Sequence, residues 1–180
     1  MESPQKTHVR QHYNKHCEDS VNRHINLELH TYYVYLSMAH FLDREDVPLK
    51  NFSQLLLCLS SKAREQAEKL MELQNLRGGL IKLENVQKPD DTEWNSSLQV
   101  LECALSLVKR VNKSLINLYD IANDSTDAHL RNFLGRHFLQ QQVQSLKELS
   151  DLINTQRKLG SQGCAEFLLD NLTLGGGSKN

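Results

Sequence analysis

The chain has 180 residues, and its 21 Lys and Arg residues against 22 Asp and Glu residues give a formal net charge of −1. A chain of this length forms about one domain with a real core, so a two-domain enzyme is not expected. The balanced charge argues against nucleic acid as a partner, and no apolar run approaches the ~18 residues that a membrane span needs. We expect a soluble protein with neither nucleic acid nor membrane as a partner.

The opening residues and the cysteines bear on the cellular compartment. Residues 1–26 are polar and rich in charge, without the apolar stretch of a secretory leader. The four cysteines stand far apart and form no CxxC pair, so neither a disulfide framework nor a zinc site is indicated. We expect reduced thiols and a cytoplasmic protein.

Two long stretches almost free of glycine and proline predict the first two helices. One covers 15–42, with Asn14 as its N-cap and a carboxylate, Glu28, on an otherwise apolar inward stripe. The other covers 48–77, with a proline in its first turn and Gly78 just past its end, an arrangement typical of helix boundaries. A buried carboxylate is costly unless it is paired, so the place of Glu28 on the apolar stripe needs an explanation.

Three further helices are expected in the second half of the chain. The third covers 96–123, and the fourth follows Asp127 as its cap and stops at Gly160. Within the fourth, Gly135 is a local weakness of about 1 kcal/mol relative to alanine. A short apolar helix over 164–174 completes the set.

The lengths of the connections predict the topology. Short links join the first helix to the second and the third to the fourth, so each pair is expected to be an antiparallel hairpin. The connection over 78–95 could extend up to ~60 Å, which is longer than a helix over 15–42 at ~42 Å. The prediction is an all-α, ferritin-like four-helix bundle with one long crossover and a short fifth helix. Its expected boundaries are a flexible segment over 1–14, a bundle over 15–174 and a flexible tail over 175–180.

Several short motifs make the sequence similar to animal ferritin heavy chains. They are NLEL at 26–29, YVYLSM at 33–38, LKNF at 49–52, AEKLM at 67–71, LQN and RGG within 73–79, ECAL at 102–105 and LKEL at 146–149. The resemblance covers nearly the whole chain. It implies a helical subunit that assembles into an octahedral shell for storing ferric iron, alone or together with other ferritin subunits, with its short last helix at the four-fold contacts.

Heavy chains of this kind oxidise ferrous iron at a di-iron centre inside the bundle, and parts of that centre have counterparts here. Glu28 matches a metal ligand, Tyr35 lies beside it, and Gln142 matches an amide near the second metal. Without a metal, Glu28 is expected to hydrogen-bond Tyr35, Gln142 or Gln66, or to pair with Lys62. Iron is therefore the implied cargo, but the remnant donors support it only weakly at this intrachain site, and folding requires no cofactor.

The remaining ligand positions are altered. Ala63 stands at the position of the bridging carboxylate, Gln66 at that of the histidine and Val108 at that of the glutamate on the third helix, while Lys62 replaces a neighbouring carboxylate. A pair of iron ions needs a bridging carboxylate and further anionic ligands to offset the repulsion between the ions. We expect that the chain has no ferroxidase activity of its own.

Two other sites of ferritins can be compared in the same way. The acidic three-fold channel positions of heavy chains correspond to Asn132 and Gly135, with Arg131 beside them, so attraction of cations should be weak or reversed. Of the carboxylate cluster with which light chains nucleate mineral, only Glu65 is retained. The chain matches neither a working heavy chain nor a working light chain at these sites.

Three functional hypotheses follow, in order of preference. The first is a shell subunit without its own oxidase, which forms or joins cages. The second is an active iron-oxidising ferritin with a rearranged site built on Glu28, Gln66 and Gln142. The third is a regulatory binding protein that no longer handles iron.

A separate signal lies at the start of the chain. His8, His12 and His16 recur at intervals of four, which on a helix would form a ladder able to bind a transition metal. The favoured interpretation is a frayed segment with solvated histidines.

Overall fold

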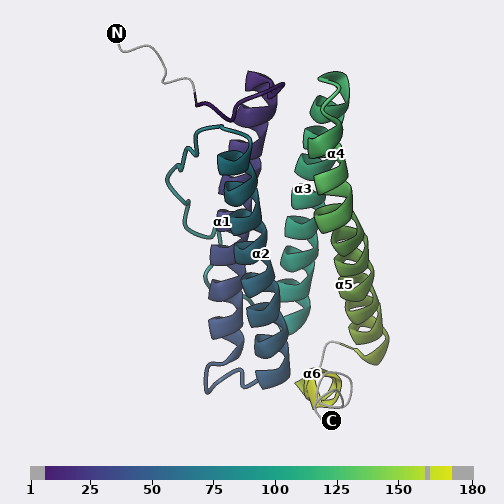
Figure 1. Ribbon diagram of the computed structural model, residues 1–180. Helices are drawn as coiled ribbons and strands as arrows, with labels where there is room; N and C mark the ends of the chain where they lie inside the picture. The colour runs from purple at the N-terminus through teal and green to yellow at the C-terminus, as the bar shows by residue number, and fades with distance from the viewer. Residues whose placement is uncertain (1–6, 161–162, 172–180) are drawn as a thin grey trace, which may run out of the picture.

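In the computed structural model, residues 7–160 and 163–171 are described, and the ordered elements in these ranges are all helical. The long helices stand side by side as four rods, and the last helix lies across one end of the bundle (Figure 1). The elements are α1 (Lys15–Leu42), α2 (Lys50–Leu76), α3 (Ser97–Asp124), α4 (Ala128–Leu134), η1 (Gly135–Leu139), α5 (Gln140–Leu159) and α6 (Gly163–Leu169). The all-α bundle with a long crossover and a short extra helix is therefore confirmed.

Side-chain caps define where three of the helices begin. Asn14 accepts a hydrogen bond from the His16 amide at the start of α1, and Asp127 accepts one from Leu130 at the start of α4. Ser96 caps α3 in the same way. Each oxygen satisfies an amide that has no partner within its own helix, which is why the predicted starts at Asn14 and Asp127 are correct.

The start of α2 differs from the prediction. Pro48 does not lie in the first turn, because α2 begins at Lys50 and its N-cap, Leu49, has no capping side chain. The Leu49 amide instead donates to the carbonyl of Leu42 across the connection, at 2.9 Å. This bond joins the last residue of α1 to the residue before α2. The connection between the two helices is therefore closed by a backbone hydrogen bond just ahead of the first residue of α2.

The fourth rod is not one regular helix. Gly135 opens a π-helical turn, η1, between α4 and α5, where a continuous α-helix was expected. A π turn inserts an extra residue and shifts every later side chain around the helix axis. Leu130, Leu134 and Phe138 remain fully buried before and within this turn, whereas Gln142, three residues after its end, is only half-buried.

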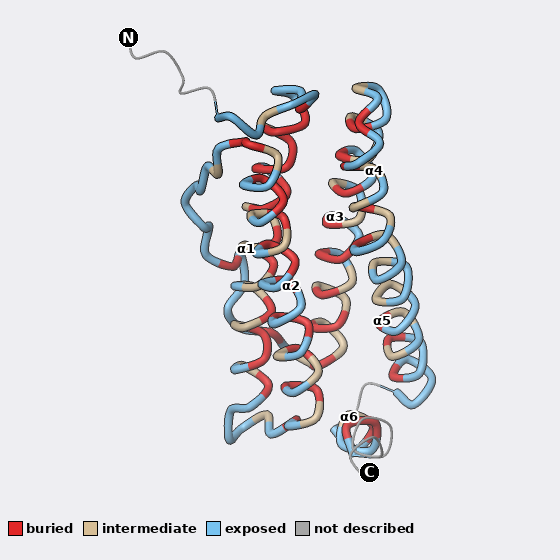
Figure 2. The backbone as a smooth tube through the Cα atoms, in the orientation of Figure 1, coloured by how far each residue is buried: buried red, intermediate tan, exposed pale blue. Residues whose placement is uncertain are grey.

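The core consists of two apolar clusters, one toward each end of the bundle. One is built around Tyr35, Phe52, Leu56 and Leu101, and the other contains Ile25, Leu70, Leu115 and Phe138; the buried faces point inward along all four rods (Figure 2). Glu28, Ala63 and Gln66 belong to neither cluster. The middle of the bundle is thus less completely filled with apolar side chains than its ends.

The crossover over 77–96 runs along the outside of α1 (Figure 1). Asn22 and Asn26, one turn apart on α1, each donate to a crossover carbonyl and accept from a crossover amide, at 2.8–3.1 Å. At its far end Trp94 is buried and packs edge to face on Phe41, with ring centroids 5.1 Å apart. The connection is therefore held to the bundle at both ends.

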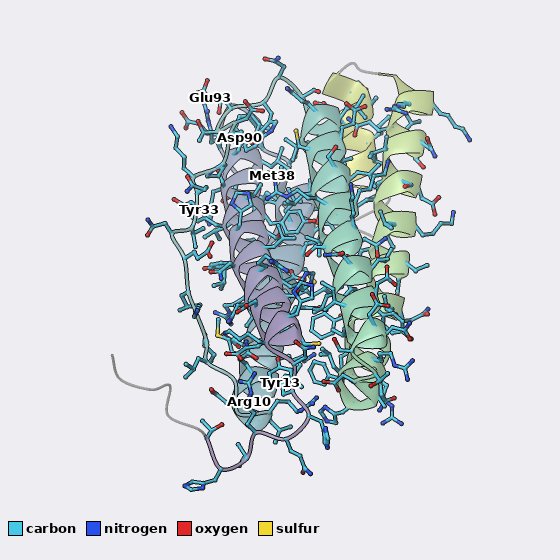
Figure 3. The ribbon with its side chains drawn as sticks, turned by 90° about the horizontal axis from the view of Figure 1, so that it is seen from above. Arg10, Tyr13, Tyr33, Met38, Asp90 and Glu93 are labelled. Carbon is cyan, nitrogen blue, oxygen red and sulfur yellow. The ribbon has the colours of Figure 1, made fainter. Side chains whose placement is uncertain are left out.

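Residues 7–14 are attached to the end of the bundle, which the sequence did not predict. The Thr7 hydroxyl donates to the Gly78 carbonyl at 2.9 Å, and the buried Tyr13 hydroxyl donates to Gln74 at 2.6 Å. Figure 3 shows Arg10 and Tyr13 together at this end of the molecule. Of the expected flexible segment, 1–14, residues 1–6 lie outside the described residues.

The histidine ladder does not form. His8 and His12 precede α1, which begins at Lys15, so only His16 lies on a helix. All three side chains are exposed, as the solvated interpretation requires.

The C-terminal helix docks against the starts of two long helices. Asp170 accepts a hydrogen bond from the Phe52 amide near the start of α2, and Glu166 accepts one from the Ser97 amide at the start of α3. Phe167 on the same helix is exposed. The last part of the predicted helix, 172–174, and the predicted tail, 175–180, lie outside the described residues.

Candidate functional site

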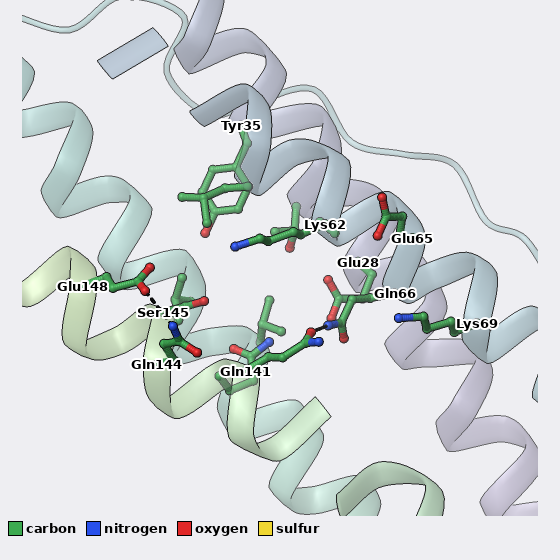
Figure 4. A pocket seen from close by; sticks show the side chains of 16 residues that line it. Glu28, Tyr35, Lys62, Glu65, Gln66, Lys69, Gln141, Gln144, Ser145 and Glu148 are labelled. Carbon is green, nitrogen blue, oxygen red and sulfur yellow. Dashed lines mark hydrogen bonds between the residues drawn. The ribbon is translucent and has the colours of Figure 1, made fainter. Parts of the chain in front are cut away.

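A pocket of about 320 Å³ opens between the two apolar clusters in the middle of the bundle. We call it the central pocket, and Figure 4 shows its side chains. Its lining residues come from α1, α2, α3 and α5. They are Glu28, Thr31, Tyr35, Leu59, Lys62, Ala63, Glu65, Gln66, Lys69, Val108, Val111, Gln141, Gln142, Gln144, Ser145 and Glu148.

The structure brings the predicted intrachain positions together at this pocket. The remnant residues Glu28, Tyr35 and Gln142 line it, and so do the altered positions Lys62, Ala63, Gln66 and Val108 together with Glu65. Ala63 and Val108 are both 5% exposed. Two walls of the pocket that would carry carboxylates in the heavy chains are therefore apolar.

Glu28 has a different partner from those expected. Its Oε1 lies 3.3 Å from Nε2 of His24, one turn earlier on α1, and both side chains are almost completely buried. Among the described residues, neither Tyr35, Gln66 nor Gln142 donates a hydrogen bond to Glu28, and Lys62 is exposed. The prediction of Glu28's partner was wrong, because the polar side chain that Glu28 contacts comes from its own helix.

His24 is held in place from two sides. Its Nδ1 lies 2.9 Å from the Ser114 hydroxyl on α3, and its ring meets that of Phe138 edge to face, with centroids 6.3 Å apart. His24 was not among the predicted site residues. The available signal was the spacing of four between His24 and Glu28, which puts both on one face of a helix.

The amides of the pocket are partly satisfied. Gln66 donates through Nε2 to the side-chain oxygen of Gln141, which fixes the orientation of the Gln66 amide. Within the described part of the chain, Oε1 of Gln66 and Oε1 of Gln142 are buried and have no hydrogen-bond donor. Buried acceptors without protein donors are uncommon, and both of these atoms belong to residues that line the central pocket.

Charged groups of both signs line the pocket. Glu65 and Glu148 are exposed at its edge, as is Lys62, while Lys69 is half-buried. Burial raises the pKa of Tyr35, and the negative charge of Glu28 raises it further, so the phenol stays protonated at neutral pH.

The donors present do not fit a pair of iron ions. Glu28 is the single buried carboxylate among the described residues that line the pocket, and the described part of the chain contains no group of three or more His, Cys, Asp and Glu side chains placed to hold a metal ion. A di-iron site needs a bridging carboxylate and further anionic ligands. No oxidation step can be derived from this arrangement.

The comparison with known families agrees with the architecture. A family model described as a ferritin-like domain matches residues 18–159, which cover the four long rods except the first three residues of α1, together with all residues that line the central pocket. This chain belongs to the ferritin family. Ferritins are iron-storage proteins that bind iron and usually assemble into cages, so the coarse prediction of family and fold holds for this ferritin.

The positions that match the three-fold channel of ferritin heavy chains do not line the central pocket. Arg131 and Asn132 are on α4, and Gly135 starts η1. Arg131 donates to the Asn123 side chain at 2.8 Å, and Asn132 is exposed. None of these three positions has an acidic side chain.

Among the described residues, no helix of this ferritin is both long enough and apolar enough to cross a membrane.

Proposed function

We propose that this ferritin is a shell subunit without its own ferroxidase centre, which forms cages or joins cages built with other ferritin subunits. The observation that carries the proposal is the replacement of two ligand positions by apolar side chains. Ala63 and Val108 are buried in the wall of the central pocket, where the resemblance to heavy chains places carboxylates.

The charge balance of the pocket supports the same conclusion. Two iron ions about 3.5–4 Å apart concentrate positive charge, which bridging and terminal carboxylates must offset. Glu28 supplies one buried negative charge, and the amides of Gln66 and Gln142 are neutral. The Lys62 and Lys69 ammonium groups offset the charges of Glu65 and Glu148, the two other carboxylates of the pocket, which are exposed at its edge. Binding of an iron pair is therefore disfavoured.

Exposed apolar side chains support assembly of the proposed shell. Leu80, Leu83 and Val86 are exposed along the crossover, and Phe167 and Leu168 are exposed on α6. Isolated exposed apolar residues are ordinary, but clusters of them mark contact surfaces. We assign the crossover cluster and the α6 cluster to subunit contacts of an octahedral shell like that of heavy chains.

The environment proposed for this shell is the cytoplasm. All four cysteines fall within the described residues and are free thiols, which agrees with a reducing compartment.

The absence of acidic side chains at Arg131, Asn132 and Gly135 implies weak or reversed attraction of cations at the three-fold channels. In mixed cages, subunits with a complete ferroxidase centre would carry out the iron oxidation.

The test is aerobic oxidation of ferrous iron by the purified chain, at about two iron ions per chain. We expect a rate no faster than that of a buffer blank. A fast and saturable burst that disappears in Glu28→Gln would overturn the proposal in favour of a rearranged active site on Glu28, Gln66 and Gln142.

Assembly is tested separately by sedimentation velocity of the same preparation. The expected species is a large closed shell, either alone or after mixing with intact ferritin subunits. A chain that stays monomeric or dimeric in both conditions contradicts the shell role, and its capture on an unrelated protein would favour a regulatory one.

A further inference from the structure

A second pocket, of about 360 Å³, opens where the end of the crossover meets α1 and the first half of α3. We call it the crossover pocket, and Figure 3 marks Met38 and Asp90, two of its lining residues. None of its lining residues lines the central pocket, and none belongs to the two clusters assigned to subunit contacts. Its volume lies within the range of about 300–1,000 Å³ that is usual for small-molecule sites.

The inner wall of the crossover pocket is apolar and almost completely buried. Met38 is 2% exposed, Trp94 6% and Leu107 7%, and the half-buried Val34 extends the same wall. Such a wall favours an aromatic or aliphatic group, because apolar surface leaves water on binding.

Trp94 adds one polar requirement to this wall. Its indole N–H is buried and has no acceptor among the described residues. Buried tryptophan N–H groups usually find a hydrogen-bond partner, and an indole nitrogen can only donate. A ligand oxygen at the inner wall would supply the missing acceptor.

The outer rim of the crossover pocket carries a surplus of negative charge. Asp90 and Asp91 are exposed at the rim, and neither has an ion-pair partner in the described part of the chain. Glu102 at the same pocket is paired with Arg157 at 2.7 Å. Arg110 also lines the pocket and offsets one of the two remaining charges, so the rim favours a cation.

We propose that the crossover pocket binds a small organic cation, an arylalkylamine with a hydroxyl group at the end of its ring. The ammonium group pairs with Asp90 and Asp91, the ring packs on the apolar wall, and the hydroxyl oxygen accepts from the indole N–H of Trp94. Three different features of the pocket thus set three separate requirements. Neither iron nor assembly of the shell enters the proposal, which therefore does not depend on the proposed function.

The experiment compares three ligands by calorimetric titration of the full chain. Tyramine meets all three requirements and should bind with a dissociation constant below about 1 mM. Phenethylamine lacks the hydroxyl group and leaves the indole N–H unpaired, and 4-ethylphenol lacks the ammonium group. Each should bind at least about fivefold more weakly than tyramine. Absence of tyramine binding, or equal affinity for all three ligands, overturns the proposal.

The location of the ligand can be read from Trp94, because it is the single tryptophan of the chain. Its fluorescence should change on addition of tyramine and saturate with the calorimetric constant. Trp94→Phe keeps an aromatic ring but removes the N–H, so this variant should bind tyramine no better than phenethylamine, with its folding verified by circular dichroism. Unchanged fluorescence at saturation, or an intact preference for tyramine in the variant, contradicts the assigned position.

The charge requirement is tested at the rim. Asp90→Asn and Asp91→Asn should each weaken tyramine binding by about fivefold, the effect of one unit charge at about 4 Å in water, and leave 4-ethylphenol binding unchanged. The matched control is Glu93→Gln, which removes one charge from the same segment. Glu93 is 83% exposed and does not line the pocket, so tyramine should bind this variant as it binds the wild type. Equal effects of all three substitutions would overturn the proposal.

Discussion

The Asp170 carboxylate accepts a hydrogen bond of 2.8 Å from the backbone amide of Phe52, and thereby joins the end of α6 to the start of α2. The Asn51 side chain donates to the other oxygen of Asp170 at 3.2 Å. Because Leu49 at the N-cap of α2 has no capping side chain, Asp170 acts as the cap from a distant part of the chain. Its negative charge also opposes the positive end of the helix dipole.

Replacing Asp170 with alanine should lower the free energy of unfolding by about 1 kcal/mol, as for the loss of other helix caps. Denaturant unfolding followed by circular dichroism measures the change. Asp120→Ala, on an exposed face of α3, is the control and should have little effect. Equal stability of Asp170→Ala and the wild type would show that the α6 contact contributes nothing to α2.

Two glycines should respond in opposite directions to alanine. Gly78 has a φ of +72°, and a Cβ there would lie 2.4 Å from Oγ1 of Thr7, so Gly78→Ala should cost about 1–2 kcal/mol or more. Gly135 has a helical φ of −61°, and a Cβ added there would meet no neighbouring side chain within 4 Å, so Gly135→Ala should stabilise by up to about 1 kcal/mol. Thermal unfolding of the two variants in parallel gives the comparison, and the same sign for both would contradict this expectation.

Much of the bundle could be predicted because, apart from Gly135, no glycine or proline interrupts its four long rods. Asn14, Asp127 and Gly78 indicated helix boundaries from local chemistry alone. The prediction that Pro48 lies in the first turn of the second helix was wrong for a physical reason. The Leu49 amide donates across the hairpin to the Leu42 carbonyl, and α2 begins only at the next residue. That bond depends on how two helices meet, which local sequence does not specify.

The candidate site was predicted less completely. Matching motifs to heavy chains found the positions that line the pocket. It did not find His24 as the partner of Glu28, because His24 lies next to the predicted inward face of α1 and was not counted as part of it. The π turn at Gly135 was expected only as a weak point, and it sets where Gln142 falls relative to the pocket. A shift of one residue within a helix arises from packing and leaves no periodic signal.

Acid should destabilise the end of the bundle that holds Glu18 and Asp127. Burial raises the pKa of Glu18, but hydrogen bonds from the Leu80 amide and Arg10 outweigh it and lower the pKa below its ordinary 4.5. Burial likewise opposes the bonds from Arg77 and the Leu130 amide that lower the pKa of Asp127 below its ordinary 3.8. The folded state therefore binds fewer protons than the unfolded chain.

The sign of the pH effect follows directly. The stability from both carboxylates is fully present above their unfolded pKa values and is lost as the pH falls through the lower folded values. Unfolding free energies between about pH 3 and pH 6 should decline toward acid, and less steeply in Asp127→Asn, which keeps an oxygen for the Leu130 amide. A slope identical to that of the wild type would mean that Asp127 does not contribute.

Restoring the missing ligands provides the strongest test of the positional matching. Lys62→Glu, Ala63→Glu, Gln66→His and Val108→Glu together should rebuild a di-iron site around Glu28, because all four positions line the central pocket with it. The new carboxylates supply the bridge and negative charge that two iron ions require. Aerobic ferrous oxidation should then rise by at least about tenfold over the unmodified chain.

A matched triple variant that keeps Ala63 isolates the bridging position. It has the added charge without the bridge, so its oxidation rate should remain near that of the unmodified chain. Buried carboxylates without metal are costly, and the quadruple variant should therefore be less stable than the wild type in the absence of iron and regain stability when iron binds. A quadruple variant that folds, assembles and still binds no iron pair would show that these positions do not converge as the structure indicates.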